Sequence, residues 1–421
     1  MNVSKHVLTS LFCIIHLVCV GQNSIQTSRI LASAFSSSKV DFYKEKVHQF
    51  TELDYAIPIL EKIEVRSETN DFDLSQQDMT VRVTTNSRSS RKAHKQYHES
   101  VQHMSEMEYE AEIINALAYR YNLIVDYIYS NEKLELQKAK HNLALDKVKL
   151  LKRMVSLVSF DIVELIDAED EVNQTQRVIL DTEIKINNLS DRLLELVNLK
   201  VLNIRKEDVV SIKEIRSFLT SLQPTSENHP IVEIRSARHY NALMEHEWEA
   251  AKSKFSLGFL QASYGHRPGS GFRSNFSLGV GFDIPFKGTS RLDLNEKKIN
   301  ILDTQSEYIS TKEELAQSLL ESSTRLKRLL SMYDLLNKQI EDGNAAYALN
   351  EYSRQSTASP LAIIKLKELN TNTEVLLMEV EQEITSCYLA YLYSTGILGE
   401  APYKNYLDPS TSLLPLSHLN F

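Results

Sequence analysis

The stretch from Asn275 to Phe286, NFSLGVGFDIPF, constrains the fold most, because apolar and small or polar residues alternate along it without a break. Successive side chains of a β-strand point to opposite faces, so a strand here has one wholly apolar face. About ten residues of such alternation, in a tilted strand, match the length of a transmembrane β-strand. The side chains that we expect to face lipid are Phe276, Leu278, Val280, Phe282 and Ile284.

Glycine and proline are scarce, with 11 Gly and 9 Pro among 421 residues. Because these residues interrupt helices and strands, we expect most of the chain to run in long uninterrupted elements. The net charge is −9 and the pI is about 5.8, and no block of basic residues is present. This charge balance argues against nucleic acid as a partner.

Residues 1–22 have the pattern of a secretory signal peptide, with a short charged start, a largely apolar run and Gly21 at a plausible cleavage point. The apolar run is too short for a spanning helix. Cys13 and Cys19 are expected to leave with the signal, because neither follows the small residue that a lipidation site needs. We therefore expect an exported protein in which Cys387 is the remaining cysteine and no intramolecular disulfide forms.

The rest of the chain is expected to repeat one order of elements, after a Ser-rich flexible leader at residues 23–39. Each half has a short helix, two strands and then two long helices whose apolar residues recur at heptad spacing. The expected strands are residues 63–68, 79–84, 255–264 and 275–286, and the expected long helices are residues 91–155, 160–204, 287–352 and 360–393. The alternation in the third strand shifts phase near Leu260.

This order predicts an internal duplication with a period near 200 residues. The first repeat spans residues 40–224, the second spans residues 225–398, and residues 399–421 form a C-terminal tail. Ser159 and Ser359 lie at equivalent places in the two repeats, and each is expected to cap the helix that follows. Each pair of long helices then forms an antiparallel coiled-coil hairpin.

Four strands per chain are too few to close a barrel, and an open sheet edge in lipid leaves backbone groups unsatisfied. Other copies must therefore supply the missing strands. Three copies would give about twelve strands, which is enough for a barrel with a lumen. The expected fold class is an α+β membrane protein with long helical hairpins and a shared barrel.

Several short motifs agree with this arrangement. They are the helix start Asn228-His229-Pro230, the strand end Asp283-Ile284-Pro285-Phe286 followed by Lys287-Gly288, the paired turns at Ser159 and Ser359, and the helix end Ser394-Thr395-Gly396-Ile397-Leu398. On these motifs the chain, from about residue 40 to residue 398, resembles the TolC-like outer-membrane efflux protein family. The resemblance implies a homotrimer with a shared 12-stranded β-barrel and an α-helical tunnel.

The resemblance also implies a function. Such a protein is a passive exit channel in the outer membrane of a Gram-negative bacterium, with its helices in the periplasm. It belongs to a tripartite efflux or secretion system, in which an inner-membrane transporter supplies the energy and a periplasmic adaptor docks near Ser159 and Ser359. The tip of the helices would open when coiled-coil pairs shift against one another.

Some members of the family carry acidic residues after the second of these turns, where they narrow the periplasmic entrance. Here the corresponding inward candidates are Ala362 and Lys365, which argues against an acidic gate at that place. Asp161 and Glu164, after the first turn, could supply acidic character instead and form a cation-selective feature. The alternative is a solvated helix N-terminus, where acids interact favourably with the helix dipole.

Other candidate sites have simpler interpretations. His94 and His98 have the i, i+4 spacing of a metal site, but no further ligand completes the set, so a solvated helix face is expected. Cys387 falls on an apolar stripe and is expected in the core. No pattern of a nucleophile with its base is present, and we expect neither an enzyme nor a bound cofactor.

A rival hypothesis from another class is an exported periplasmic coiled-coil scaffold that binds partners and does not span the membrane. Cell fractionation separates the two hypotheses, because a scaffold leaves with the soluble periplasm whereas a barrel stays with the outer membrane.

Overall fold

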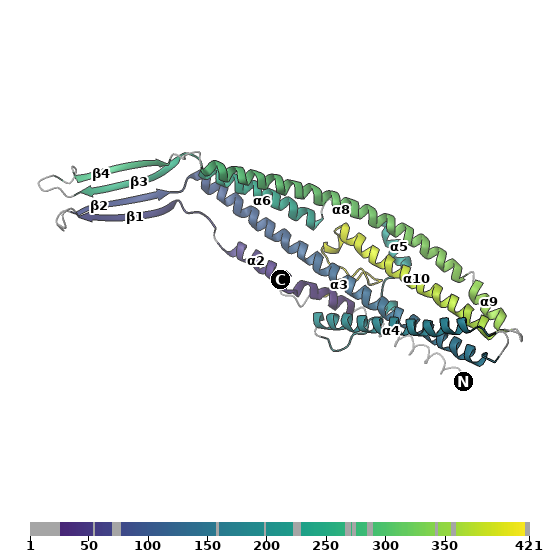
Figure 1. The fold of residues 1–421 in the computed structure, drawn as a ribbon. Helices are drawn as coiled ribbons and strands as arrows, with labels where there is room; N and C mark the ends of the chain where they lie inside the picture. The colour runs from purple at the N-terminus through teal and green to yellow at the C-terminus, as the bar shows by residue number, and fades with distance from the viewer. Residues whose placement is uncertain are drawn as a thin grey trace, which may run out of the picture. The chain divides into compact units, whose positions relative to one another are not determined.

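The computed structural model describes residues 26–53, 55–69, 77–156, 160–197, 199–221, 229–265, 271, 275–283, 289–341, 344–354 and 359–416. The helices are α2 (Ser38–Glu52), α3 (Arg88–Arg153), α4 (Ile162–Val197), α5 (Ile212–Ser221), α6 (Pro230–Lys252), α8 (Thr289–Glu341), α9 (Asn344–Ser353) and α10 (Pro360–Ser394) (Figure 1). Short 3₁₀ turns are η1 (Ser33–Ser36), η2 (Lys206–Asp208) and η3 (Ile397–Gly399). The strands are β1 (Leu60–Thr69), β2 (Gln77–Thr85), β3 (Ser256–Gly265) and β4 (Phe276–Asp283).

The chain divides into two compact units, and each unit draws on both halves of the sequence. The strand unit comprises Phe42–Ala111 and Pro230–Glu314, and the helical unit comprises Met1–Asp41, Glu112–His229 and Leu315–Phe421. The helices α3 and α8 each contribute one part to the strand unit and the other part to the helical unit. No helix in the described part of the chain combines the length and the apolar character needed to cross a lipid bilayer.

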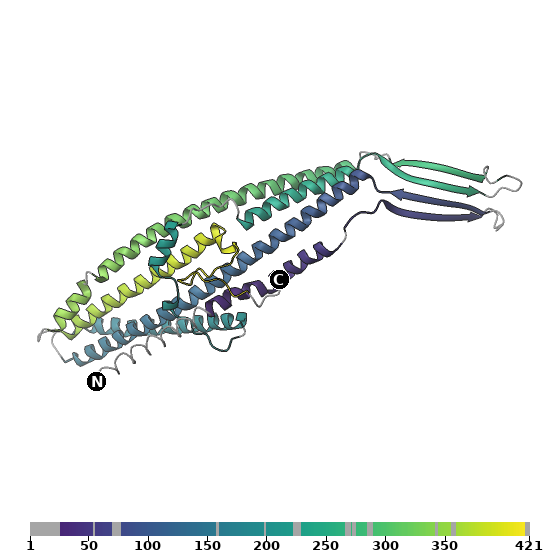
Figure 2. The same ribbon diagram turned by 180° about the vertical axis from the view of Figure 1, so that it is seen from behind.

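The strand unit contains one antiparallel sheet with the order β1-β2-β3-β4, so β1 and β4 are its edges. The sheet joins the two expected strand pairs through β2 and β3, where Val81 pairs with Ala262 and Arg82 with Gln261. Within the strand unit, Figures 1 and 2 show no described helix lying over either face of the sheet. In the described part of the strand unit, no helix therefore packs on either face of this sheet.

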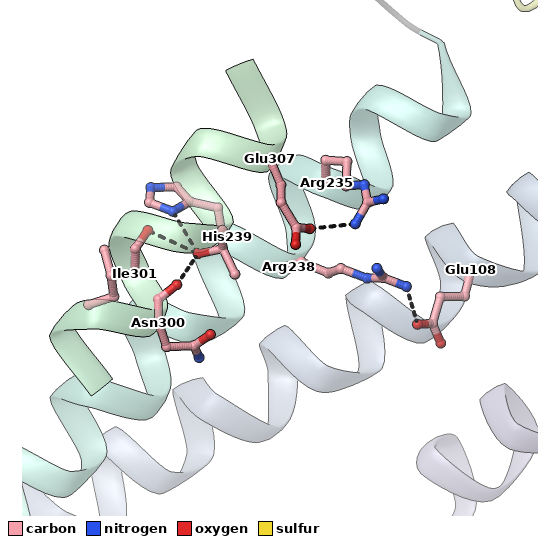
Figure 3. Close-up of polar contacts among 8 residues, drawn as sticks. Glu108, Arg235, Arg238, His239, Asn300, Ile301 and Glu307 are labelled. Carbon is pink, nitrogen blue, oxygen red and sulfur yellow. Dashed lines mark hydrogen bonds and ion pairs between the residues drawn. The ribbon is translucent and has the colours of Figure 1, made fainter. Parts of the chain in front are cut away.

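Polar contacts hold α6 between the strand-unit parts of α3 and α8 (Figure 3). Arg235 on α6 pairs with Glu307 on α8 at 2.5 Å, and Arg238 pairs with Glu108 on α3 at 3.4 Å. His239 Nδ1 lies 3.3 Å from the hydroxyl of Thr304 on α8. Contacts to both neighbours therefore fix the rotation of α6 about its own axis.

The heptad stripes form the core of the helical unit, as the sequence predicts. On α3, the five stripe residues are almost fully buried: Ile114, Leu117, Tyr121, Ile124 and Ile128. The stripes of the partner helices bury Leu193 on α4, Leu329 on α8 and Ile384 on α10. Cys387 is buried on the α10 stripe, which confirms its expected place in the core.

The leader is not flexible over the part that the structure describes, and this corrects the prediction for residues 23–39. Residues 26–32 are helical and continue into η1, and Ile30 and Leu31 are fully buried. Arg120 on α3 donates from Nε to Ser33 Oγ at 2.9 Å and from Nη2 to Ser33 O at 3.0 Å. Burial of two neighbouring aliphatic residues and these bonds to α3 order a segment that shows little periodicity of its own.

The C-terminal tail packs against the same unit. Tyr121 on α3 donates its hydroxyl to Lys404 O at 2.9 Å and accepts the N–H of Tyr406 at 3.0 Å. Asn405 is fully buried and donates to Thr27 Oγ1 at 3.0 Å. The tail is loop-like, as expected, but its polar groups anchor it to both the leader and α3.

The long helix expected at residues 287–352 is two helices, α8 and α9, with residues 342–343 outside the described residues. The sequence there is Asp342-Gly343, and glycine commonly follows a helix end. The apolar stripe that predicts a long helix, from Leu319 to Ile340, lies wholly within α8, so it could not show where that helix ends. The expected signal peptide, residues 1–22, also lies outside the described residues.

Candidate functional site

The apolar face of the sheet is the first candidate site. Ladder partners form two apolar rows across all four strands, Val65-Val81-Ala262-Leu278 and Ile63-Val83-Leu260-Val280. Six of these eight side chains are nevertheless exposed in the single chain, with Leu278 77% and Val280 56% exposed, whereas Val83 and Ala262 are half-buried. A continuous exposed apolar surface of this kind marks a surface that another apolar phase or molecule covers.

The predicted lipid-facing residues lie on this face, because Phe276, Leu278, Val280 and Phe282 alternate along β4 and all four are exposed. The fifth residue of that prediction, Ile284, lies outside the described residues.

A register irregularity in β3 explains the phase shift in its sequence. Leu257 pairs with Phe282, but Phe259 pairs with Gly281, so the chain gains one residue at Gly258. An extra residue of this kind, a β-bulge, moves the following side chains to the opposite face. The bulge therefore places Leu260 on the apolar face and Phe259 on the other face.

The polar face of the sheet carries a hydrogen-bonded network. Arg82 on β2 donates from Nε and Nη2 to Gln261 Oε1 at 3.0 and 2.8 Å. Gln261 donates in turn to Ser263 Oγ at 3.0 Å, and Thr80 donates to the same oxygen at 3.1 Å. The two faces of the sheet thus differ in chemistry, because one is mainly apolar and exposed and the other carries the hydrogen-bonded polar network.

The starts of α4 and α10 form the second candidate site, which we call the helical tip. Glu164 on α4 and Lys365 on α10 form an ion pair of 2.8 Å. Asp161 Oδ1 accepts the N–H of Val163 at 2.8 Å, so Asp161 caps α4. Ser359 directly precedes α10, but its side chain makes no capping hydrogen bond, and Ser159 lies outside the described residues.

The expectation of serine caps at this tip therefore needs correction for both helices, because the Ser359 side chain makes no capping bond to α10. The residue that caps α4 is Asp161 rather than a serine, because its carboxylate is the group that reaches a free N–H of the first turn. Ala362, the other inward candidate, is half-buried on α10.

Lys147 on α3 is a tip residue that the sequence analysis missed. Its ammonium lies 3.3 Å from Glu171 on α4 and 3.5 Å from Glu368 on α10, and its side chain is only 13% exposed. Burial alone would lower the pKa of Lys147, but these two carboxylates raise it. Next to it, Val148 and Leu151 pack against α4. No sequence pattern reveals a lysine shared by helices so far apart along the chain.

A second missed cluster centres on Lys206 in η2. Its ammonium pairs with Glu132 on α3 at 2.6 Å and also with Glu381 on α10. Burial raises the pKa of Glu381, and Lys206 opposes that shift. The one signal in the sequence is that Glu381 adjoins the apolar stripe of α10, where a carboxylate needs a partner.

His94 and His98 do not lie on a solvated helix face, which corrects that prediction. His94 is 9% exposed and its ring centre lies 4.7 Å from that of Trp248 on α6, and His98 stacks on Tyr55 at 4.2 Å. Side chains from the neighbouring segments cover both imidazoles. Among the residues that the structure describes, no group of three or more His, Cys, Asp and Glu side chains is placed to hold a metal ion.

No protein-family model matches the sequence, and no curated protein does. Solved structures do match the fold. The outer membrane protein VceC from Vibrio cholerae has 14% sequence identity and a TM-score of 0.61, and the match covers 88% of this chain and 96% of that one. The outer membrane channel MtrE of Neisseria gonorrhoeae has 15% identity and a TM-score of 0.62, with 91% of each chain covered.

The outer membrane channel CmeC of Campylobacter jejuni matches at 12% identity with a TM-score of 0.61, over 93% of this chain and 87% of that one. Each of these matches covers most of both chains. The chain therefore has the fold of the TolC-like outer-membrane channel proteins.

Proposed function

We propose that this protein is the outer-membrane exit channel of a tripartite efflux or secretion system. It is a passive conduit for solutes, and an inner-membrane transporter coupled through a periplasmic adaptor supplies the energy. The support comes from the apolar face of the sheet, from the fold shared with solved outer membrane channels, and from the sequence motifs.

The apolar face of the sheet is the strongest support for a membrane channel. Two apolar rows cross all four strands, and most of the side chains in them stay exposed in the single chain. Burial of apolar surface is worth about 25 cal/mol per Å², so a soluble protein that left this face bare would forgo a large stabilisation. Lipid covers such a face without any further protein layer, which favours a membrane sheet over a periplasmic scaffold.

The free edges of the sheet support a homotrimer. β1 and β4 each have one neighbour within the chain, and in lipid their outer backbone groups need partners. Pairing β4 of one copy with β1 of the next satisfies both edges. Three copies then close a barrel of about twelve strands, whose polar face lines a water-filled lumen.

The helical tip is the proposed entrance and docking region. Glu164 and Lys365 tie the starts of α4 and α10 together, and Lys147 ties α3 to the same two helices. Breaking such ties lets the hairpins shift against each other, which is a common way for packed helices to switch. The adaptor is proposed to bind at these helix starts and to favour the shifted arrangement.

Conductance across planar lipid bilayers tests the channel. The purified protein should give discrete current steps, and Lys365→Gln should raise the fraction of time spent open, because it removes the pair with Glu164. The matched control is Lys367→Gln, which removes a nearby exposed lysine that forms no ion pair among the described residues. The channel hypothesis is wrong if neither the wild type nor Lys365→Gln conducts.

Cell fractionation tests the same proposal against the scaffold. The protein should remain with outer-membrane detergent extracts and should run as an oligomer that heating dissociates. Recovery in the soluble periplasmic fraction would favour the scaffold.

A further inference from the structure

Arg82 is held in a defined position on the polar face of the sheet. Two of its nitrogens donate to Gln261 Oε1, and its guanidinium carbon lies 4.3 Å from the ring centre of Phe259. Stacking on an aromatic ring and a bidentate hydrogen bond both suit the flat guanidinium group. The positive charge is therefore fixed in place rather than carried on a freely moving side chain.

The fold makes a specific place for the aromatic ring. The bulge at Gly258 places Phe259 on the polar face, where it is an aromatic residue next to the polar network. The ring lies over Gly281 on β4, where an added Cβ would come within 2.2 Å of it. The bulge at Gly258 and the space over Gly281 thus position the Phe259 ring, and this ring packs against the guanidinium of Arg82.

The charge of Arg82 is not neutralised by its supports. Gln261 is neutral, and no carboxylate among the described residues forms an ion pair with Arg82. Its ladder partner Glu64 on β1 instead binds Arg66 at 2.9 Å and lies 3.7 Å from Lys62. The carboxylate of Glu64 is therefore already engaged by Arg66 and Lys62.

The acidic residues of the same face lie toward the two ends of the strands. Glu68 and Asp78 are ladder partners beside the turn between β1 and β2, and Asp283 ends β4. The polar face thus has a basic band between two acidic ends.

We propose that Arg82 is a selectivity-determining residue of the channel and that it favours anionic solutes. The inference rests on the proposed function, in which the polar face lines the lumen. Repeated in each copy, the basic band becomes a ring of fixed guanidinium groups around a water-filled pore. Such a ring raises the local concentration of anions and repels cations, as rings of Arg or Lys do in anion-conducting pores.

Reversal potentials in a potassium chloride gradient across a planar bilayer test this proposal. Arg82→Gln removes the charge but keeps a polar side chain, and the ratio of chloride to potassium permeability should fall several-fold. Arg82→Lys keeps the charge and should stay close to the wild type. Arg235→Gln is the matched control, because it removes an arginine paired with Glu307 in the helices and should leave the ratio unchanged.

A second variant keeps the arginine in place. Gln261→Glu preserves the size of the side chain and its bonds to Arg82 but adds a carboxylate that neutralises the guanidinium. It should lower the permeability ratio as Arg82→Gln does. All variants are measured alone and together with Lys365→Gln, so that resistance at the helical tip does not mask the barrel.

The outcomes distinguish a failure of the selectivity proposal from a failure of the channel proposal. If Arg82→Gln or Gln261→Glu conducts with the wild-type permeability ratio in both backgrounds, Arg82 does not set selectivity, although the channel stands. If no protein conducts in either background, the proposed function itself is wrong.

Discussion

At the scale of single residues, Val280 and Gly279 are neighbours on β4 but belong to opposite faces of the sheet. Val280 lies in an apolar row with 56% of its surface exposed, whereas the nearest atom to an added Cβ at Gly279 is the Gln261 Cβ at 3.8 Å. We predict that Val280→Arg costs about 2–4 kcal/mol of stability in lipid, because it places a charge near the middle of the face that we propose to contact lipid. Gly279→Ser should be nearly neutral, because a small polar side chain has room on the polar face.

Folding into lipid vesicles, followed by urea titration of the folded fraction, measures both variants. The assignment of the two faces would be wrong if the variants were equally destabilised.

Alternation in the sequence was sufficient to assign the faces of β4, because the side-chain period of a strand is two residues and needs no knowledge of its neighbours. The same rule located the irregularity in β3 near Leu260, and the bulge at Gly258 is its cause. Alternation could not reveal that Arg82 meets Gln261 and Phe259, because that contact depends on the register between β2 and β3. The ion pairs of the tip could not be predicted either, because they depend on how α3, α4 and α10 pack together.

At the scale of the elements, Lys206 joins η2 to α3 and α10 through two carboxylates. Removing it leaves Glu381, which is 9% exposed, without its cation. We predict that Lys206→Ala destabilises the helical unit by about 1–3 kcal/mol, the cost of leaving charged hydrogen-bonding groups unpaired. Lys133→Ala is the control, because its exposed pair with Glu379 at 3.7 Å should contribute about 0–1 kcal/mol.

Thermal unfolding followed by circular dichroism compares these two lysine variants. Equal losses of stability would show that the Lys206 cluster is no stronger than an exposed ion pair.

The histidine cluster between α3 and α6 gives a pH dependence. Burial lowers the pKa of His94 below its ordinary value of 6.5, with smaller contributions from His98 and Lys252, and burial also lowers the pKa of His98. Between the lowered values and 6.5 the unfolded chain binds more protons than the folded chain, so the free energy of unfolding falls as the pH drops through that interval. Above about pH 6.5 the stability of this cluster is fully present.

The fluorescence of Trp248 reports on this titration directly, because the chain contains a single tryptophan and its ring lies 4.7 Å from that of His94. A protonated imidazole quenches indole emission, so emission should fall on acidification with a midpoint below pH 6.5. His94→Phe keeps a ring in the cluster and should weaken the transition, whereas His48→Gln, on the exposed face of α2, should leave it unchanged. A midpoint at or above 6.5 would contradict the assigned effect of burial.

Element positions were predicted well where periodicity was strong and poorly where tertiary contacts decide. The stripe through Ile114 and Leu117 predicted the buried face of α3, because the heptad pattern is a property of one helix. The leader escaped prediction, since Ile30 and Leu31 become ordered only by packing within the helical unit. Likewise, nothing in the spacing of His94 and His98 shows that Trp248 and Tyr55 cover them.

At the scale of the whole molecule, the edges of the sheet distinguish a closed trimer from a single chain. Among the described residues of one chain, β1 and β4 are the outer strands of the sheet, whereas β2 and β3 are paired with a strand on both sides. In a closed barrel every strand has two neighbours, and the backbone N–H groups of the edge strands become as well protected as those of the inner strands.

Amide hydrogen exchange measured by mass spectrometry on the detergent-solubilised oligomer tests this closure. We predict similar protection for peptides from β1, β2, β3 and β4, because pairing of β4 with β1 of the next copy leaves no open edge. After heating dissociates the oligomer, β1 and β4 should exchange first, and β2 and β3 serve as the internal reference. Fast exchange of β1 and β4 in the intact oligomer would mean that the sheet edges do not join between copies, and the shared barrel would have to be abandoned.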